Sequence, residues 1–197
     1  MIGRALALAA LTAAPALAQE VFDARAAGRL LFNERRAELV AHPQPSVDQR
    51  LMALLQDRRQ VSGFLDSVPY YGAIAVSPDQ GLVEEAIVAV GNYHSSGSAA
   101  AAALGRCDAQ RPAESRACVI VAEIRPRGWQ TRALQLSAGA TATFRREYRR
   151  GRGERAFAIS PTSGGYGIGR GAGAAASAIA ACNSAGGVAD CRVAISD

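Results

Sequence analysis

Two short apolar segments of the chain share one alternating pattern of small and larger side chains. The first is GAIAVSP, residues 72–78, and the second is AFAISP, residues 156–161. A two-residue period is typical of a β-strand, and both segments end at Ser-Pro, where proline cannot continue a central strand. Each segment therefore predicts a short strand followed by a turn.

The similarity between the two regions continues after these strands. GSAAAAALGRC, residues 97–107, aligns with AGAAASAIAAC, residues 172–182, and Cys118 aligns with Cys191. The gaps between the aligned pairs fall in the loops, which is typical of two copies of one structural unit. Each copy predicts two strands, an alanine-rich helix that ends at a cysteine, and a final strand after the next cysteine. The second strands are expected at about residues 82–90 and 166–170.

This order predicts an α+β protein with two pseudo-repeated strand-strand-helix-strand units, each containing a local disulfide. The units span residues 69–124 and 155–197, and a connector, residues 125–154, joins them. A helical N-terminal segment, residues 19–68, precedes the first unit. These boundaries follow the aligned segments and the less regular sequence between them.

Two helices are expected in the N-terminal segment and one in the connector. Residues 22–32 have a short amphipathic pattern, and residues 46–62 have a longer one that opens with a capping box of Ser46 and Gln49. The apolar face of this longer helix consists of three leucines: Leu51, Leu54 and Leu55. In the connector, Ser137 is placed to cap a helix. Its apolar face repeats every four residues: Leu136, Ala140, Phe144 and Tyr148.

The first 18 residues have the pattern of a secretory signal peptide. Arg4 precedes an apolar run, residues 5–14, and the small residues 16–18 form a cleavage site. The run is shorter than the roughly 20 residues that a membrane span needs, and no later segment reaches that length without charges. The sequence therefore predicts an exported protein, periplasmic or secreted, with no transmembrane segment.

Four cysteines in an exported chain indicate two disulfides. Cys107, Cys118, Cys182 and Cys191 allow three pairings, and the repeat favours one local pair in each copy. A zinc site would need close ligand pairs such as C-x-x-C. These spacings do not provide such pairs, so no metal is predicted.

All 22 basic residues are arginine, and the chain has no lysine. Pyridoxal phosphate-dependent enzymes hold their cofactor on a lysine, so synthases of this class are excluded. No other cofactor is predicted from the sequence.

The arginines are concentrated in residues 145–155, where six of them accompany two glutamates. These six are the candidate anion-binding residues: Arg145, Arg146, Arg149, Arg150, Arg152 and Arg155. The potential of such a patch adds up locally, which predicts an anionic envelope polymer or an acidic protein as partner. The alternative is an exposed connector whose charges are solvated. Specific nucleic-acid binding is not predicted, because the nearby aromatic residues lie on the expected buried helix face.

The stretch GGYGIGRGAGAAASAIAAC, residues 164–182, resembles a dinucleotide-binding loop. Gly167, Gly169 and Ala172 fit G-x-G-x-x-A, but that motif needs a βαβ unit and an acidic residue about twenty positions further on. Only 15 residues follow Cys182, and a predicted disulfide interrupts them. The glycines are therefore expected to serve backbone geometry rather than a nucleotide.

The stretch GNYHSSGS, residues 91–98, holds the candidate catalytic residues. His94 could act as a base for a neighbouring nucleophile such as Ser95, with Asp79 orienting the ring. The alternative is that Ser98 caps the following helix and that His94 lies in a loop or beneath a strand edge.

The repeated A-x-A-x-S-P strand, the glycine-bearing second strand and the alanine helix with its Cys-loop-Cys ending resemble the secreted bacterial family called domain of unknown function 4189. The layout that includes NYH, RPRGWQTRALQLS and FRREYRRG is also similar to short exported alphaproteobacterial proteins. The resemblance spans most of the mature chain. It implies export and disulfides but no particular activity.

These observations predict an exported, non-enzymatic protein that binds a macromolecule or takes part in envelope stress. The alternative is a small periplasmic hydrolase that uses the loop of residues 91–98.

Overall fold

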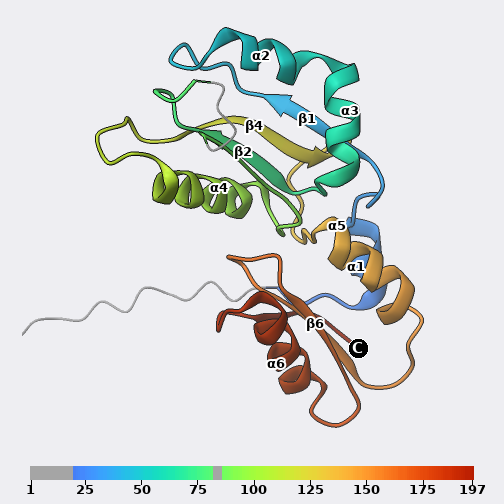
Figure 1. Ribbon diagram of the computed structural model, residues 1–197. Helices are drawn as coiled ribbons and strands as arrows, with labels where there is room; N and C mark the ends of the chain where they lie inside the picture. Colours follow the sequence, from blue (N-terminus) through green and yellow to red (C-terminus); the bar gives the residue numbers. More distant parts are fainter. Residues whose placement is uncertain (1–19, 82–85) are drawn as a thin grey trace, which may run out of the picture.

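The computed structural model describes residues 20–81 and 86–197 (Figure 1). The protein contains helices and two antiparallel sheets, which confirms the predicted α+β class. The predicted signal peptide and the first part of the second expected strand, residues 82–85, lie outside the described residues. No described helix is both long enough and apolar enough to cross a membrane.

The first sheet has four strands in the order β1-β4-β2-β3, and each neighbouring pair is antiparallel. Helix α4 covers one face of this sheet, and helices α2 and α3 lie on the other face (Figure 1). The strands are β1 (Ala37–Ala41), β2 (Gly72–Val76), β3 (Ile87–Val90) and β4 (Val119–Pro126). The helices are α2 (Gln49–Gln56), α3 (Arg58–Ser67) and α4 (Ser96–Gln110).

The second sheet has three strands in the order β6-β5-β7, again antiparallel. Its elements are β5 (Arg155–Ile159), β6 (Tyr166–Arg170), α6 (Ala174–Gly186) and β7 (Arg192–Ser196). In the first sheet β2 lies between β3 and β4, and in the second sheet β5 lies between β6 and β7. In each case one neighbour is the next strand of the chain, and the other is the strand that follows the helix. The central strand also shifts register at one place in each sheet, between Ile74 and Ala75 and between Phe157 and Ala158.

The alternation along β2 separates small from large side chains. Ala73 and Ala75 pack against α4, whereas Ile74 and Val76 pack against α2 on the opposite face. Successive side chains of a strand point to opposite faces, so the alanines allow a close helix on one side. The larger residues form a second core on the other side.

Strand β5 divides its side chains in the same way. Ala156 and Ala158 pack against α6. Phe157 and Ile159 point to the other face and join a cluster that includes Phe22 and Ile195, from near the two ends of the described residues. The second sheet is therefore also covered on both faces, but the cover of its second face comes from outside residues 155–197.

That cover consists of an N-terminal helix and the connector. Helix α1 (Ala24–Leu30) follows Phe22, whose backbone N–H donates to the carbonyl of Ala194 on β7 at 3.0 Å. The connector contributes α5 (Ala138–Thr143) and the π-helix η2 (Phe144–Tyr148). The ring of Tyr148 meets that of Phe157 edge-on at 5.8 Å between centroids. As predicted, Ser137 caps the connector helix, accepting a hydrogen bond from Ala140 N–H.

The N-terminal segment differs from the helical expectation at one element, because residues 37–41 form strand β1. This strand pairs along its whole length with β4. Strand propensity depends strongly on the neighbouring strands, and AELVA alone contains good helix formers. Pairing with a distant strand therefore decides its conformation.

The expected helix at residues 46–62 also begins later and is divided. Asp48 is the N-cap of α2 and accepts from Arg50 N–H, so the capping box of Ser46 and Gln49 is wrong. Asp57 ends α2 and caps α3 in turn. Leu54 is 49% exposed, whereas Leu51 of the same helix is buried, so the expected apolar face is only partly buried.

The two disulfides join Cys107 to Cys118 and Cys182 to Cys191, with Cα–Cα distances of 6.1 and 6.0 Å. The predicted local pairing is confirmed. In each unit the residue after the first cysteine accepts a hydrogen bond from the backbone N–H of the second. Asp108 Oδ1 lies 3.0 Å from Cys118 N, and Asn183 Oδ1 lies 3.1 Å from Cys191 N.

Glycines of β6 allow this strand to touch the backbone of α6. A Cβ atom at Gly169 would lie 1.9 Å from the carbonyl oxygen of Ala174, and one at Gly167 would lie 2.5 Å from that of Ala178. Real Cβ atoms essentially never approach other atoms this closely. Close packing of helix on strand therefore accounts for the glycines that resemble a dinucleotide-binding loop.

We expect the loss of either disulfide to lower the free energy of unfolding by about 3 kcal/mol, because each closes a short loop in the unfolded chain. The two variants are Cys107→Ala/Cys118→Ala and Cys182→Ala/Cys191→Ala. Urea unfolding of each against the wild type measures the loss. The losses should be similar, since the loops have similar sequence separations of 11 and 9. A loss below about 1 kcal/mol in either variant would contradict this expectation.

The variant Gly169→Ala should be destabilised by about 2 kcal/mol or more, because its new methyl group collides with backbone. The control is Gly105→Ala in α4, where an added Cβ meets no atom within 4 Å. That change should stabilise the protein by about 0.5–1 kcal/mol. Thermal unfolding of both variants tests the assignment, and equal effects would refute it.

Candidate anion-binding site

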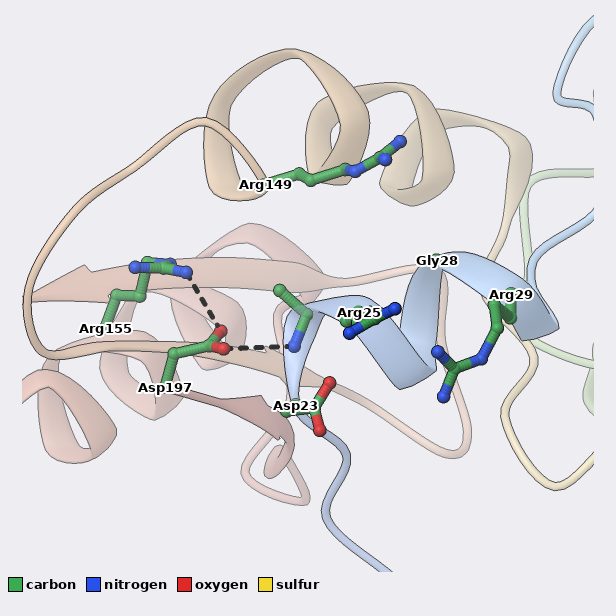
Figure 2. A pocket seen from close by; sticks show the side chains of 8 residues that line it. Asp23, Arg25, Gly28, Arg29, Arg149, Arg155 and Asp197 are labelled. Atoms are coloured by element: carbon green, nitrogen blue, oxygen red, sulfur yellow. Dashed lines mark hydrogen bonds and ion pairs between the residues drawn. The ribbon is translucent and has the colours of Figure 1, made fainter.

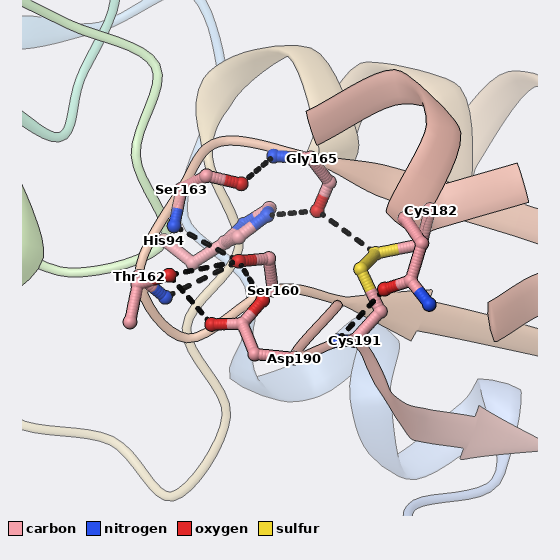
Figure 3. Close-up of a disulfide and its surroundings, with 9 residues drawn as sticks. His94, Ser160, Thr162, Ser163, Gly165, Cys182, Asp190 and Cys191 are labelled. Atoms are coloured by element: carbon pink, nitrogen blue, oxygen red, sulfur yellow. Dashed lines mark hydrogen bonds between the residues drawn. A yellow bond between two sulfur atoms is a disulfide. The ribbon is translucent and has the colours of Figure 1, made fainter. Parts of the chain in front are cut away.

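His94 connects the loop after β3 to the connector, through Ser137, and to the second unit, through Gly165. Figure 3 shows the contact with Gly165. Its side chain is buried, with 4% of the residue exposed. The N–H of Ser137 donates to Nδ1 at 3.0 Å, so Nδ1 is the acceptor nitrogen. The proton therefore belongs on Nε2, which donates to the carbonyl of Gly165 at 2.9 Å.

Burial lowers the pKa of His94 to about 4, because the charged imidazolium would lose its hydration. The ring is neutral at neutral pH, and both nitrogens are bound to backbone groups. Neither nitrogen is available to take a proton from a nucleophile, which a general base must do.

The other two catalytic candidates serve separate structural contacts. Ser95 is the N-cap of α4, where its Oγ accepts from Ser98 N–H at 3.1 Å. The sequence favours Ser98 as this cap, but the helix begins earlier, at Ser96. Asp79 pairs with Arg116, with 2.7 Å between Asp79 Oδ1 and Arg116 Nε. The hydrogen bond from the Arg116 side chain lowers the pKa of Asp79. No hydrogen bond between described atoms joins two of the three candidates.

A second polar cluster, which the sequence did not reveal, lies near His94 (Figure 3). Ser160 Oγ donates to Asp190 Oδ1 at 2.7 Å and accepts from the N–H groups of Thr162 and Ser163. The hydrogen bond from Thr162 is the main reason that the pKa of Asp190 is lowered. Both nitrogens of His94 are bound to other partners, so His94 does not serve Ser160 as a base. Ser160 and Asp190 instead stabilise the turn after β5.

Two arginines of the predicted patch are used inside the fold. Arg145 forms an ion pair with Glu34, and its Nη2 donates to the carbonyl of Phe32 at 3.1 Å. Arg155 has a side chain only 12% exposed and lies 3.3 Å from Asp197. Arg145 thus holds the segment after α1 to the connector, and Arg155 holds the end of β7 beside the start of β5.

The other four arginines of the patch are exposed. Arg146 pairs with its neighbour Glu147 at 2.9 Å. Arg149, Arg150 and Arg152 take part in no ion pair and no side-chain hydrogen bond within residues 20–81 and 86–197. The structure thus divides the predicted patch into arginines that stabilise the fold and arginines that face solvent.

A cavity of about 840 Å³ lies between α1, the end of η2 and the ends of β5 and β7 (Figure 2). Its charged lining residues come from four segments: Asp23, Arg25, Arg29, Arg149, Arg155 and Asp197. We call this cavity the arginine pocket. Sequence reasoning missed Arg25 and Arg29, which lie on the expected amphipathic helix and join Arg149 only through the fold.

The two acidic residues of the arginine pocket already have partners. Asp23 caps α1, accepting from Ala26 N–H at 2.7 Å. Asp197 accepts from Ala24 N–H at 3.1 Å and pairs with Arg155 (Figure 2). The side chains of the four arginines and two aspartates sum to a charge of +2. The positive charge is therefore carried by Arg25, Arg29 and Arg149.

The chain matches no protein-family model, no curated protein and no solved structure. A function for this protein therefore has to be inferred from the arrangement of its side chains.

Acid should destabilise the protein through His94. Its pKa is about 4 in the folded chain and about 6.5 in the unfolded chain. Between these values the unfolded chain binds a proton that the folded chain does not. The contribution of His94 is therefore complete above pH 6.5 and falls by about 3 kcal/mol as the pH drops to 4.

Urea unfolding at several pH values between 7 and 4 measures this loss. The variant His94→Gln lacks the titrating group and should lose less stability over that range than the wild type. His42→Gln, which changes the other histidine, should keep the His94 contribution. If His94→Gln has the same pH dependence as the wild type, the assignment is wrong.

Proposed function

We propose that the protein is an exported, non-enzymatic module that binds an anionic polymer of the cell envelope. The predicted signal peptide and the two disulfides support export to the periplasm or beyond it. The absence of a usable base at His94 supports a binding role over the hydrolase alternative.

The observation that carries the proposal is that solvent-facing arginines from two distant segments adjoin. Arg25 and Arg29 of α1 line one cavity with Arg149, and Arg150 and Arg152 come after Arg149 in the chain. We call these five residues the arginine surface. Like charges that gather on one face add their potentials and attract a polyanion over a distance.

A polymer fits this surface better than a single small anion. The exposed arginines extend from the arginine pocket into the loop after η2, so that repeated anionic groups could contact several guanidinium groups at once. Each contact would be weak, because exposed ion pairs contribute little individually. Binding should therefore depend on the number of contacts and on salt.

The variant Arg150→Gln/Arg152→Gln tests the proposal without altering the arginine pocket. It should elute from a heparin column at lower salt than the wild type, because fewer counterions are released on binding. The change in unfolding free energy should stay within about 0.5 kcal/mol, since both side chains are exposed.

The matched control is Arg50→Gln/Arg59→Gln, which removes the same charge from exposed positions at α2 and α3. This control should elute close to the wild type. Elution of both double variants at the same salt would show that only net charge matters, and the proposal would fail. Wild-type retention of Arg150→Gln/Arg152→Gln would also contradict it.

A further inference from the structure

We infer that the arginine pocket is a binding site for a phosphate monoester. The inference rests on the proposed function, because it names the anionic group that the protein recognises. It goes further because it assigns the ligand to one cavity, specifies the charge of the ligand and names the side chains that bind it.

The pocket gathers its cations from three parts of the chain. Arg25 and Arg29 lie one turn apart on α1, so both project from the same side of this helix. Arg149 follows η2 and lies across the cavity from α1, while Arg155 and Asp197 lie together at one end (Figure 2). A ligand in the cavity would therefore have guanidinium groups on more than one side.

The carboxylates within residues 20–81 and 86–197 do not neutralise Arg25, Arg29 and Arg149. Asp197 is held between Arg155 and the N–H of Ala24, and Asp23 is held by the first turn of α1. Arg25, Arg29 and Arg149 form no ion pair with any described acidic residue. The lining side chains thus sum to a charge of +2. The guanidinium N–H groups of Arg25, Arg29 and Arg149 form no hydrogen bond with any atom of the described residues.

A phosphate monoester matches this charge and these donors better than a carboxylate. It carries a charge of about −1.5 to −2 at neutral pH and has three terminal acceptor oxygens. A carboxylate carries one negative charge and two oxygens. The guanidinium groups of Arg25, Arg29 and Arg149, which come from two segments, could each pair with an oxygen of the phosphate. A carboxylate would leave at least one of them without a strong partner.

The volume of the pocket indicates that the phosphate carries a further group. A cavity of about 840 Å³ is in the range of small-molecule sites, roughly 300–1,000 Å³, and far exceeds a phosphate ion. Gly28 lies between the two arginines of α1 and lines the same cavity. A glycerol or sugar unit attached to the phosphate therefore has room beside the helix.

Calorimetric titration with glycerol 1-phosphate, glycerate and glycerol tests the inference on the full mature chain. These probes share a three-carbon skeleton and differ in the charged group. Glycerol 1-phosphate should bind roughly tenfold or more tightly than glycerate, because it pairs with more guanidinium groups. Glycerol should show no binding. Equal affinities for glycerol 1-phosphate and glycerate would overturn the inference.

Variants then assign the site. Arg25→Gln/Arg29→Gln should weaken glycerol 1-phosphate binding roughly tenfold or more. Arg149→Gln should also weaken binding, and it tests the segment after η2 independently of α1. Arg50→Gln/Arg59→Gln is again the control and should keep wild-type affinity. Thermal unfolding checks that each variant is folded, and Arg149→Gln decides the outcome if the changes in α1 impair folding. Wild-type affinity in a folded pocket variant would overturn the inference.

Heparin retention of the same proteins separates the two proposals. If retention depends on Arg150 and Arg152 while glycerol 1-phosphate does not bind, the polymer proposal stands and the phosphate site is refuted. If glycerol 1-phosphate binds in the pocket while retention is independent of Arg150 and Arg152, the phosphate site stands and the polymer proposal is refuted.

Discussion

The large side chains on one face of β5 must be covered, and most of the second half of the structure depends on this requirement. Phe157 and Ile159 alternate with alanines that bring α6 close to the opposite face. Residues 155–197 contain no further helix for the exposed face. Burying apolar surface is the main favourable contribution to folding, and here α1 and η2 provide the cover. The start of the described chain thereby lies against its end, with Phe22 hydrogen-bonded to β7.

The same cover determines where the free positive charge lies. Both helical segments direct apolar residues inward, Ala27 from α1 and Phe144 and Tyr148 from η2. Their remaining positions face outward, so Arg25 and Arg149 line the same cavity at the border between the two segments. Repulsion between these arginines costs little, because exposed charges interact weakly in water. A polar border next to a well-packed core is thus a place where the fold tolerates cations that form no ion pair with a described residue.

How much the sequence predicts depends on how far apart the interacting residues are. Features with a local cause were predictable: the alternation in β2 and β5, the disulfide within each unit and the cap at Ser137. Strand β1 was not, because its conformation depends on pairing with β4. The candidate site was predictable only in part, since Arg149 belongs to an obvious cluster but its partners on α1 do not. In the sequence, Arg145 and Arg155 belong to the same arginine cluster as Arg149. Only their burial and their ion pairs in the structure distinguish them from Arg149.

His94 shows why a chemically reactive residue type need not mark a catalytic site. A neutral imidazole offers one donor and one acceptor on different sides of a rigid ring, which suits a position between the N–H of Ser137 and the carbonyl of Gly165. One buried side chain thus joins the first unit to the start of the connector helix and to the second unit. The helix capped by Ser137 continues into η2, which ends beside Arg149. The hydrogen bonds of His94 therefore help to attach the helix that leads to the arginine pocket to the first unit, together with those from Ala138 N–H to the Tyr70 carbonyl and from Gly139 N–H to Asn92.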